Sequence, residues 1–240
     1  QQLIERLFQT PESMRMAGNQ RLNNLLIMAI DSLAFYLTSR DQFAEAAALL
    51  QKSEEVLSAE QRNAWRLRRA LVLLLGEPQD EGFALLKTLI LSEEDLQKRF
   101  LLWDIYLDKA LHWRRFDLAE QALLEIERSV NRASATLDDA AQARAFQSDL
   151  AYFKARLSLA QNRVDEALAW MEYAAAQAPL TSGRIYSFVL ELIERNRYTE
   201  ALKWVQRDQE NPLRIKFLSG YIHFHLGARA EAERLWRQAV

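Results

Sequence analysis

The chain has 240 residues, of which 50% are hydrophobic and 27% are charged, and this balance excludes wholesale disorder because it can bury a core. Its 31 basic and 33 acidic residues give a formal net charge of −2 without strong charge in either half, so we expect no nucleic-acid partner. No apolar run reaches the roughly 18 residues of a membrane span, and the absence of cysteine excludes disulfides and thiolate chemistry.

The first segment, residues 1–26, is expected to be helical and to be the end of an upstream repeat. Thr10 followed by Pro11 is typical of a helix start, with a capping hydroxyl before a proline at the first helical position. The N-terminus lacks an initiator Met and the basic-then-apolar order of a signal peptide. We therefore expect a cytoplasmic location and a chain from which upstream sequence, with any targeting signal in it, has been removed.

Helical periodicity continues along the chain. Between Leu22 and Leu37 the apolar residues recur at spacings of three and four, which predicts an amphipathic helix. Further helix starts are indicated by a hydroxyl residue followed three positions later by an acid or amide, in Ser58–Gln61, Ser92–Asp95 and Thr136–Asp139. Such acids could be metal ligands, but carboxylates also favour the positive end of a helix dipole, and the pattern favours that interpretation.

A short string of residues recurs along the chain. It consists of a turn residue, an apolar or aromatic residue two positions later, and then, in most copies, Glu-Ala two positions after that. The copies are Asp41–Ala46, Arg114–Ala119, Asn162–Ala167, Asn196–Ala201 and Gly227–Ala232, with a divergent copy around Gly82–Ala84. The alanines therefore stand at 46, 84, 119, 167, 201 and 232, and intervals of this length indicate stacked helical repeats.

This spacing resembles the tetratricopeptide repeat, a pair of antiparallel helices about 34 residues long. The best copy, Asp149–Pro179, has small residues at Ala155, Ala167 and Ala174, and the last copy has the family-like string Leu218–Tyr221. The resemblance implies an all-α fold, a right-handed superhelical solenoid of about six repeats over residues 27–240. The longest interval implies longer helices or an inserted helix near residues 125–147.

No catalytic or metal-binding pattern is present in the sequence. The three histidines are His112, His223 and His225, and the last two lie two residues apart, so that on a helix they face different directions. There is no His-Glu-x-x-His zinc motif and no Gly-x-Ser-x-Gly nucleophile elbow. We therefore expect no cofactor, no metal site and no enzymatic activity.

The resemblance also implies a binding surface, because the first helices of the family's repeats line a concave groove. The nominated partner-binding residues are Arg66, Arg69, Asp104, Asp108, Tyr152, Arg156, Tyr186, Phe217 and Tyr221, together with Asp31, Phe35, Asp149, Leu190, Arg214 and Phe224. Tyrosine and arginine are enriched at the energetic centres of protein interfaces. Each of these side chains could instead pack against a neighbouring helix.

The leading hypothesis is a non-catalytic scaffold that binds a protein or peptide in this groove. The alternative is a ligand- or partner-sensing repeat domain of a larger signalling ATPase or transcriptional regulator, which the absence of an initiator Met and of capping helices favours. A solenoid that ends inside a repeat exposes an apolar face, so self-association through uncapped ends is a further expectation.

Overall fold

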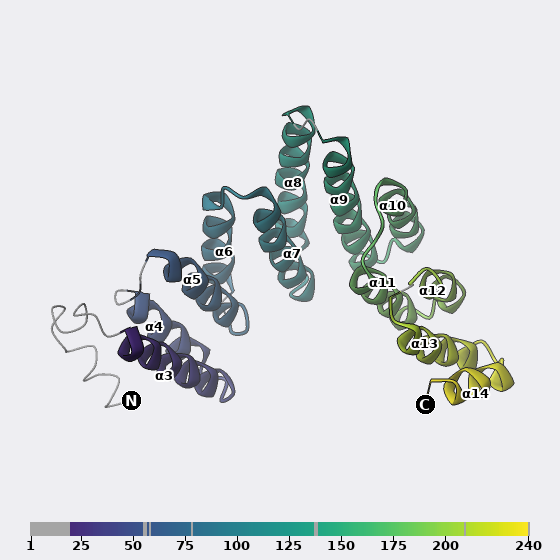
Figure 1. The fold of residues 1–240 in the computed structure, drawn as a ribbon, viewed down its shortest axis with the longest axis horizontal. Helices are drawn as coiled ribbons and strands as arrows, with labels where there is room; N and C mark the ends of the chain where they lie inside the picture. The colour runs from purple at the N-terminus through teal and green to yellow at the C-terminus, as the bar shows by residue number, and fades with distance from the viewer. Residues whose placement is uncertain are drawn as a thin grey trace. The chain divides into compact units, whose positions relative to one another are not determined.

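The computed structural model describes residues 20–54, 57, 59–77, 79–136, 139–208 and 210–239. Over these ranges the chain forms twelve α-helices and no strand, which confirms the prediction of an all-helical protein (Figure 1). Residues 1–19 of the predicted N-terminal segment lie outside the described residues, and residues 20–26 belong to the first described helix. The described residues divide into one compact unit up to Lys109 and a second from Ala110 onward.

Unit 1 contains two pairs of consecutive helices in mutual contact, followed by a fifth helix. Its helices are α3 (Gln20–Thr38), α4 (Phe43–Ser53), α5 (Ala59–Leu73), α6 (Asp80–Ser92) and most of α7 (Leu96–His112). The buried core around the first pair includes Ile30, Leu50 and Trp65. Apolar side chains on the inward faces of these helices therefore produce the packing, as the helical periodicity predicts.

Unit 2 begins in the last turn of α7 and contains α8, followed by three pairs of consecutive helices in contact. The helices are α8 (Phe116–Thr136), α9 (Ala140–Ala160), α10 (Val164–Gln177), α11 (Ser182–Glu194), α12 (Tyr198–Val205), α13 (Pro212–His225) and α14 (Arg229–Arg237). In Figure 1 each second helix of a pair lies beside the first. We refer to α9, α11 and α13 as the first helices of unit 2.

The same turn follows five helices, α3, α7, α9, α11 and α13, and leads into the next helix of the chain. One residue in each turn adopts a left-handed backbone conformation, with φ between 54° and 83°; these residues are Asp41, Arg114, Asn162, Asn196 and Gly227. At Asn162 the amide donates to Leu159 at 2.8 Å, and the next amide, of Arg163, donates to Ser158 at 2.8 Å. This paired hydrogen bonding is the Schellman helix end, which glycine and asparagine adopt at low steric cost.

An alanine is completely buried at the fourth position of the helix that follows each of these five turns. These are Ala46, Ala119, Ala167, Ala201 and Ala232, each with an exposed fraction of 0%. A methyl group at this place lets the two helix backbones approach closely without leaving a void. The prediction of small residues at these five interhelical positions is confirmed.

The prediction that Ala84 is a sixth interhelical contact residue is wrong, because Ala84 is the fifth residue of α6 and is exposed. The close approach occurs at Gly82 instead, where an added Cβ would lie 2.8 Å from Leu74 Cγ and 3.1 Å from the Ala70 carbonyl oxygen. The fourth position is taken by Phe83, which is only 3% exposed. The fourth position of α6 is therefore one residue earlier, and the close contact two residues earlier, than the string Gly82–Ala84 predicts.

The long interval between copies is accommodated by two long helices. Helices α8 and α9 each have 21 residues, so residues 125–136 end α8 and residues 140–147 begin α9. Only residues 137 and 138 between them lie outside the described residues. The extra sequence near 125–147 therefore adds turns to both helices, and the described residues contain no additional helix there.

Two predicted helix caps are corrected by the structure. Ser92 and Thr136 are the last residues of α6 and α8, so neither begins the following helix. The capping is done by acids three residues later: Asp95 accepts from the amides of residues 97 and 98, and Asp139 accepts from those of 141 and 142. A carboxylate satisfies two free amides at once and also favours the helix dipole. The predicted caps Ser58 and Thr10 lie outside the described residues.

Replacing Ala167 with leucine is expected to destabilise unit 2 by about 1–3 kcal/mol, because the larger side chain overpacks the completely buried contact between α9 and α10. The free energy of unfolding in urea, followed by circular dichroism, measures the effect. Ala169→Leu in the same helix is the matched control, since Ala169 is exposed and its change should be nearly neutral. Equal losses at both positions would contradict the packing described here.

Candidate functional site

The predicted groove residues are divided between the two units. Arg66, Arg69, Asp104 and Asp108 belong to unit 1, and Tyr152, Arg156, Tyr186, Phe217 and Tyr221 belong to unit 2. Each group is therefore considered within its own unit.

In unit 1, the two predicted arginines of α5 are engaged in ion pairs with acids of the second helices. Arg66 Nε lies 2.9 Å from the Glu54 carboxylate, and Arg69 lies 3.7 Å from Glu54 and 2.6 Å from Glu81. The side chain of Arg69 is only 14% exposed. These arginines therefore join consecutive helices of unit 1, and neither lines the pocket described next.

An open pocket of about 560 Å³ lies between α3 and α5. Asp31 and Arg68 form an ion pair at its wall, and Phe35 beside them is 77% exposed. Counted back from the fourth residue of the second helix, Arg68 corresponds to Asp31, and Val72 corresponds to Phe35. The one-residue shift at α6 explains why the family alignment selects Arg69 in place of its neighbour.

The predicted aspartates of α7 are placed separately from this pocket. Asp108 is exposed and lies 3.5 Å from the ammonium of Lys109, while Asp104, one turn earlier, is half-buried. Neither aspartate lines the pocket between α3 and α5.

In unit 2, Tyr152 is a packing residue of α9. Its ring is 4% exposed, and the guanidinium of Arg184 lies 4.8 Å from the ring centroid. Arg184 also forms an ion pair with Asp149, and Arg156 lies 5.8 Å from the same ring. A cation over the face of a desolvated aromatic ring is attracted by its quadrupole, so this contact ties α11 to α9.

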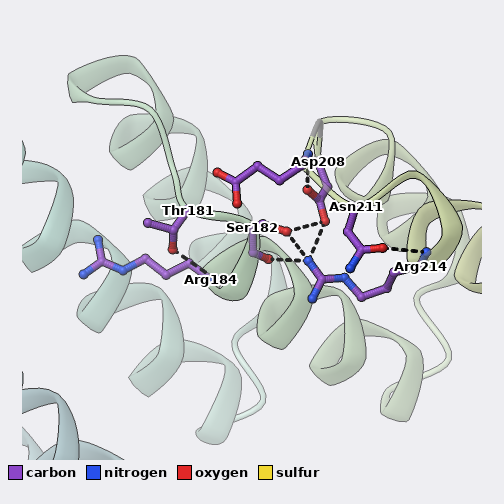
Figure 2. Close-up of polar contacts among 7 residues, drawn as sticks. Thr181, Ser182, Arg184, Asp208, Asn211 and Arg214 are labelled. Carbon is purple, nitrogen blue, oxygen red and sulfur yellow. Dashed lines mark hydrogen bonds and ion pairs between the residues drawn. The ribbon is translucent and has the colours of Figure 1, made fainter.

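Tyr186 repeats this arrangement one helix pair later. The guanidinium of Arg214 lies 4.6 Å from the Tyr186 ring centroid, and Tyr186 is half-buried. Arg184 and Arg214 are each the third residue of their helix, and a capping side chain accepts from the backbone amide of each, Thr181 at 3.4 Å and Asn211 at 3.1 Å (Figure 2). The two arginines therefore have equivalent positions in consecutive first helices.

A buried polar cluster holds the Arg214 side chain in place. Asp208, in the connection before α13, is 5% exposed and accepts from the Ser182 hydroxyl at 2.7 Å and from Arg214 at 2.8 Å (Figure 2). Burial raises the pKa of the Asp208 carboxyl, but the hydrogen bonds from Arg214 and Ser182 more than offset it, so the pKa lies below its ordinary value of 3.8. A carboxyl group with a lowered pKa is a weaker base than an ordinary one. Asp208 therefore serves to hold α11 and α13 together through Ser182 and Arg214.

Four large side chains are exposed along one face of α13. They are Leu213 (59% exposed), Phe217 (59%), Tyr221 (37%) and Phe224 (45%), and we call them the α13 stripe. Their spacings of four, four and three residues place them within about 80° of one another around the helix. The stripe is thus continuous along the helix and exposed, whereas Tyr152 is buried and Tyr186 is half-buried.

The C-terminal end of the stripe contacts other aromatic residues. The Tyr221 ring lies 4.5 Å from the His225 ring, which stacks on Tyr198 at 4.8 Å, and the Phe224 ring lies 6.0 Å from that of Trp236. These contacts limit the motion of the exposed rings. A surface whose side chains are held before binding loses less conformational entropy when a partner docks.

Sequence reasoning selected part of this arrangement. It nominates Phe217, Tyr221 and Phe224, but it does not find Leu213, Arg184, Ser182 or Asp208. The shared third position of Arg184 and Arg214 in their helices is a signal that an alignment of the two helix starts would have found. No such signal marks Asp208, because its role depends on two helices that meet only in the folded chain.

The described part of the chain contains neither a cluster of candidate metal ligands nor a helix suited to a bilayer. No three His, Asp or Glu side chains come together there as a candidate metal site. Among the helices described, none is both long and apolar enough to cross a bilayer. No protein-family model matches the sequence, and no curated protein was found to be similar to it.

Proposed function

We propose that the chain is a non-catalytic protein-binding scaffold and that a partner segment docks on the α13 stripe. The observation that carries this proposal is the exposure of four large apolar side chains on a single helix face. Single exposed apolar residues are ordinary on protein surfaces, but a contiguous stripe of them is typical of an interaction site. Aromatic residues dominate the energetic centres of such sites.

The repeated helix pairs support a tetratricopeptide-like interpretation of the fold. Five connections between consecutive helices share the left-handed turn residue and the buried alanine that follows it five positions later. A repeated turn with a repeated contact gives successive pairs similar geometry, which favours a right-handed superhelical solenoid of the kind that presents its first helices to partners. The proposed role as a scaffold follows from this interpretation.

Four carboxyl groups have a pKa below the ordinary value, which does not suit a general base that works near neutral pH. Hydrogen bonds from arginines lower the pKa of the carboxyl groups of Asp117, Glu200 and Glu231, as they do for Asp208. General acid–base catalysis uses groups whose pKa lies near the working pH, and these carboxyl groups are shifted in the opposite direction. Their partners, Arg115, Arg197 and Arg234, make ion pairs typical of a structured surface.

Replacing Phe217 with alanine is expected to weaken binding of the natural partner by about 2 kcal/mol, because a large aromatic side chain in the centre of an interface excludes water at little rotamer cost. A photo-crosslinking amino acid at position 217 would identify the partner in cells, and calorimetry with that partner would measure the loss.

The chain provides matched controls for the stripe in other helices of unit 2. Tyr173 in α10 is 45% exposed and Leu124 in α8 is 54% exposed, so Tyr173→Ala and Leu124→Ala correspond to Tyr221→Ala and Leu213→Ala. We expect the control variants to bind normally. If the stripe variants fold and bind as tightly as the controls, the partner docks elsewhere and the proposal fails.

A further inference from the structure

Two residues of the α13 stripe, Phe217 and Leu213, occupy positions at which other first helices of unit 2 contact the following first helix. Tyr152, Tyr186 and Phe217 each stand fifteen residues before the buried alanine of the following helix. At this shared position Tyr152 is 4% exposed, Tyr186 is half-buried and Phe217 is 59% exposed. A ring at this position is thus covered in α9, partly covered in α11 and open in α13.

A second position of the stripe shows the same relation. Ser148, Ser182 and Leu213 each stand nineteen residues before the corresponding alanine, and their exposed fractions are 2%, 7% and 59%. Ser182 receives the Arg214 side chain of the following first helix. Two of the four stripe positions, those of Leu213 and Phe217, therefore correspond to positions in α9 and α11 that are buried or half-buried.

The covering group at the first two rings is the same in both cases. Arg184 lies 4.8 Å from the Tyr152 centroid, and Arg214 lies 4.6 Å from the Tyr186 centroid. Each arginine is the third residue of its helix and follows a capping Thr or Asn by three positions. The geometry points to an α-helix of a partner protein as the occupant of the α13 stripe, with a capped first turn whose third residue is an arginine placed over Phe217.

The acids that pair with Arg184 and Arg214 indicate a further feature of the partner helix. Arg184 is paired with Asp149 of the receiving helix, whereas Arg214 is paired with Asp208, which lies six residues before it on its own segment. On α13, the place that corresponds to Asp149 is occupied by Arg214 itself, eighteen residues before Ala232. The incoming helix must therefore carry its own acid, as the segment from Asp208 to Arg214 does, because α13 offers a cation at that place.

This inference rests on the proposed function, and its test uses the intact 240-residue chain. The probe is a helix-stapled synthetic peptide with the sequence of residues 207–226, which contains the acid, the capping Asn211 and Arg214. Within the chain itself, Tyr186 is already occupied by the chain's own Arg214, so the stripe is the open receiving surface in unit 2 for this peptide. Fluorescence anisotropy measures its affinity for the chain and for variants at Phe217.

We expect Phe217→Leu, which keeps an apolar side chain but removes the ring, to weaken binding of the peptide about fivefold, the size of a partly desolvated cation–π contact. Phe217→Tyr should restore the affinity. A peptide with Gln in place of Arg214 should bind about fivefold more weakly and should no longer respond to Phe217→Leu, which completes a double-mutant cycle. Tyr173→Leu is the control. Because Phe217 is 59% exposed, these variants should keep the circular dichroism spectrum of the unmodified chain.

The outcomes separate the inference from the proposed function. Additive effects of the two substitutions would overturn the placement of arginine over Phe217. If Leu213→Asp with Phe224→Asp still abolished binding of both peptides, the stripe would remain a docking surface. If that double variant bound both peptides normally, the proposed docking surface would fail as well. Concentration-dependent dimerisation of the chain alone, abolished by the same double variant, would replace the partner helix with a second copy.

Discussion

Replacing Phe83 with alanine is expected to destabilise unit 1 by about 3–4 kcal/mol, since truncating a buried phenylalanine removes its transfer free energy and leaves a cavity. Phe83 is 3% exposed at the fourth position of α6, and its ring meets that of Tyr106 in α7 edge-to-face at 5.1 Å. The neighbouring backbone cannot close the cavity easily, because Gly82 already holds α6 against Leu74, the residue that follows α5. Urea unfolding followed by circular dichroism measures the loss.

The matched control for this prediction is Ala84→Leu at the next residue. Ala84 is exposed, so a larger apolar side chain there should change the free energy of unfolding by less than about 0.5 kcal/mol. If Ala84→Leu were strongly destabilising while Phe83→Ala was tolerated, the contact register of α6 would be that of the other five copies. The two variants together therefore decide between the registers.

Replacing Asp208 with alanine is expected to destabilise unit 2 by about 3 kcal/mol. The substitution leaves the Arg214 guanidinium, whose side chain is 28% exposed, without its carboxylate partner, and leaves the buried Ser182 hydroxyl without its acceptor. The connection before α13 also loses the acceptor of the Glu210 amide. Asp165→Ala is the control, because this side chain is 90% exposed and its pairing with Arg197 should contribute little.

The pH dependence of stability gives an independent check on Asp208. Because the pKa of this carboxyl is lower in the folded chain than its ordinary value of 3.8, its contribution is fully present above that value and is lost as the pH falls through the folded pKa. The unmodified chain should therefore lose more stability below about pH 4 than Asp208→Asn does. Parallel stability profiles for the two proteins in this range would contradict the ion-paired state.

The helix caps show how far local sequence rules reach. A hydroxyl residue three positions before an acid correctly indicates a helix start nearby, but it leaves two candidate capping residues in each segment. Asp95 and Asp139 cap their helices, while Ser92 and Thr136 end the preceding ones. Which of the two residues caps the helix depends on where the preceding helix ends. That end depends on how many turns of the preceding helix pack against a neighbour.

Local periodicity in the sequence is sufficient to determine the helical class, the places of five turns and five of the six predicted alanine contacts. These features depend on residues three to five positions apart, whose relation is set by the geometry of a single helix. The exposure of the groove residues depends on tertiary structure. Tyr152, Tyr186 and Phe217 hold the same repeat position, yet the first is buried, the second is half-buried and the third is exposed. The side chain of the following first helix makes this difference, because Arg184 and Arg214 cover the first two rings from more than twenty residues away.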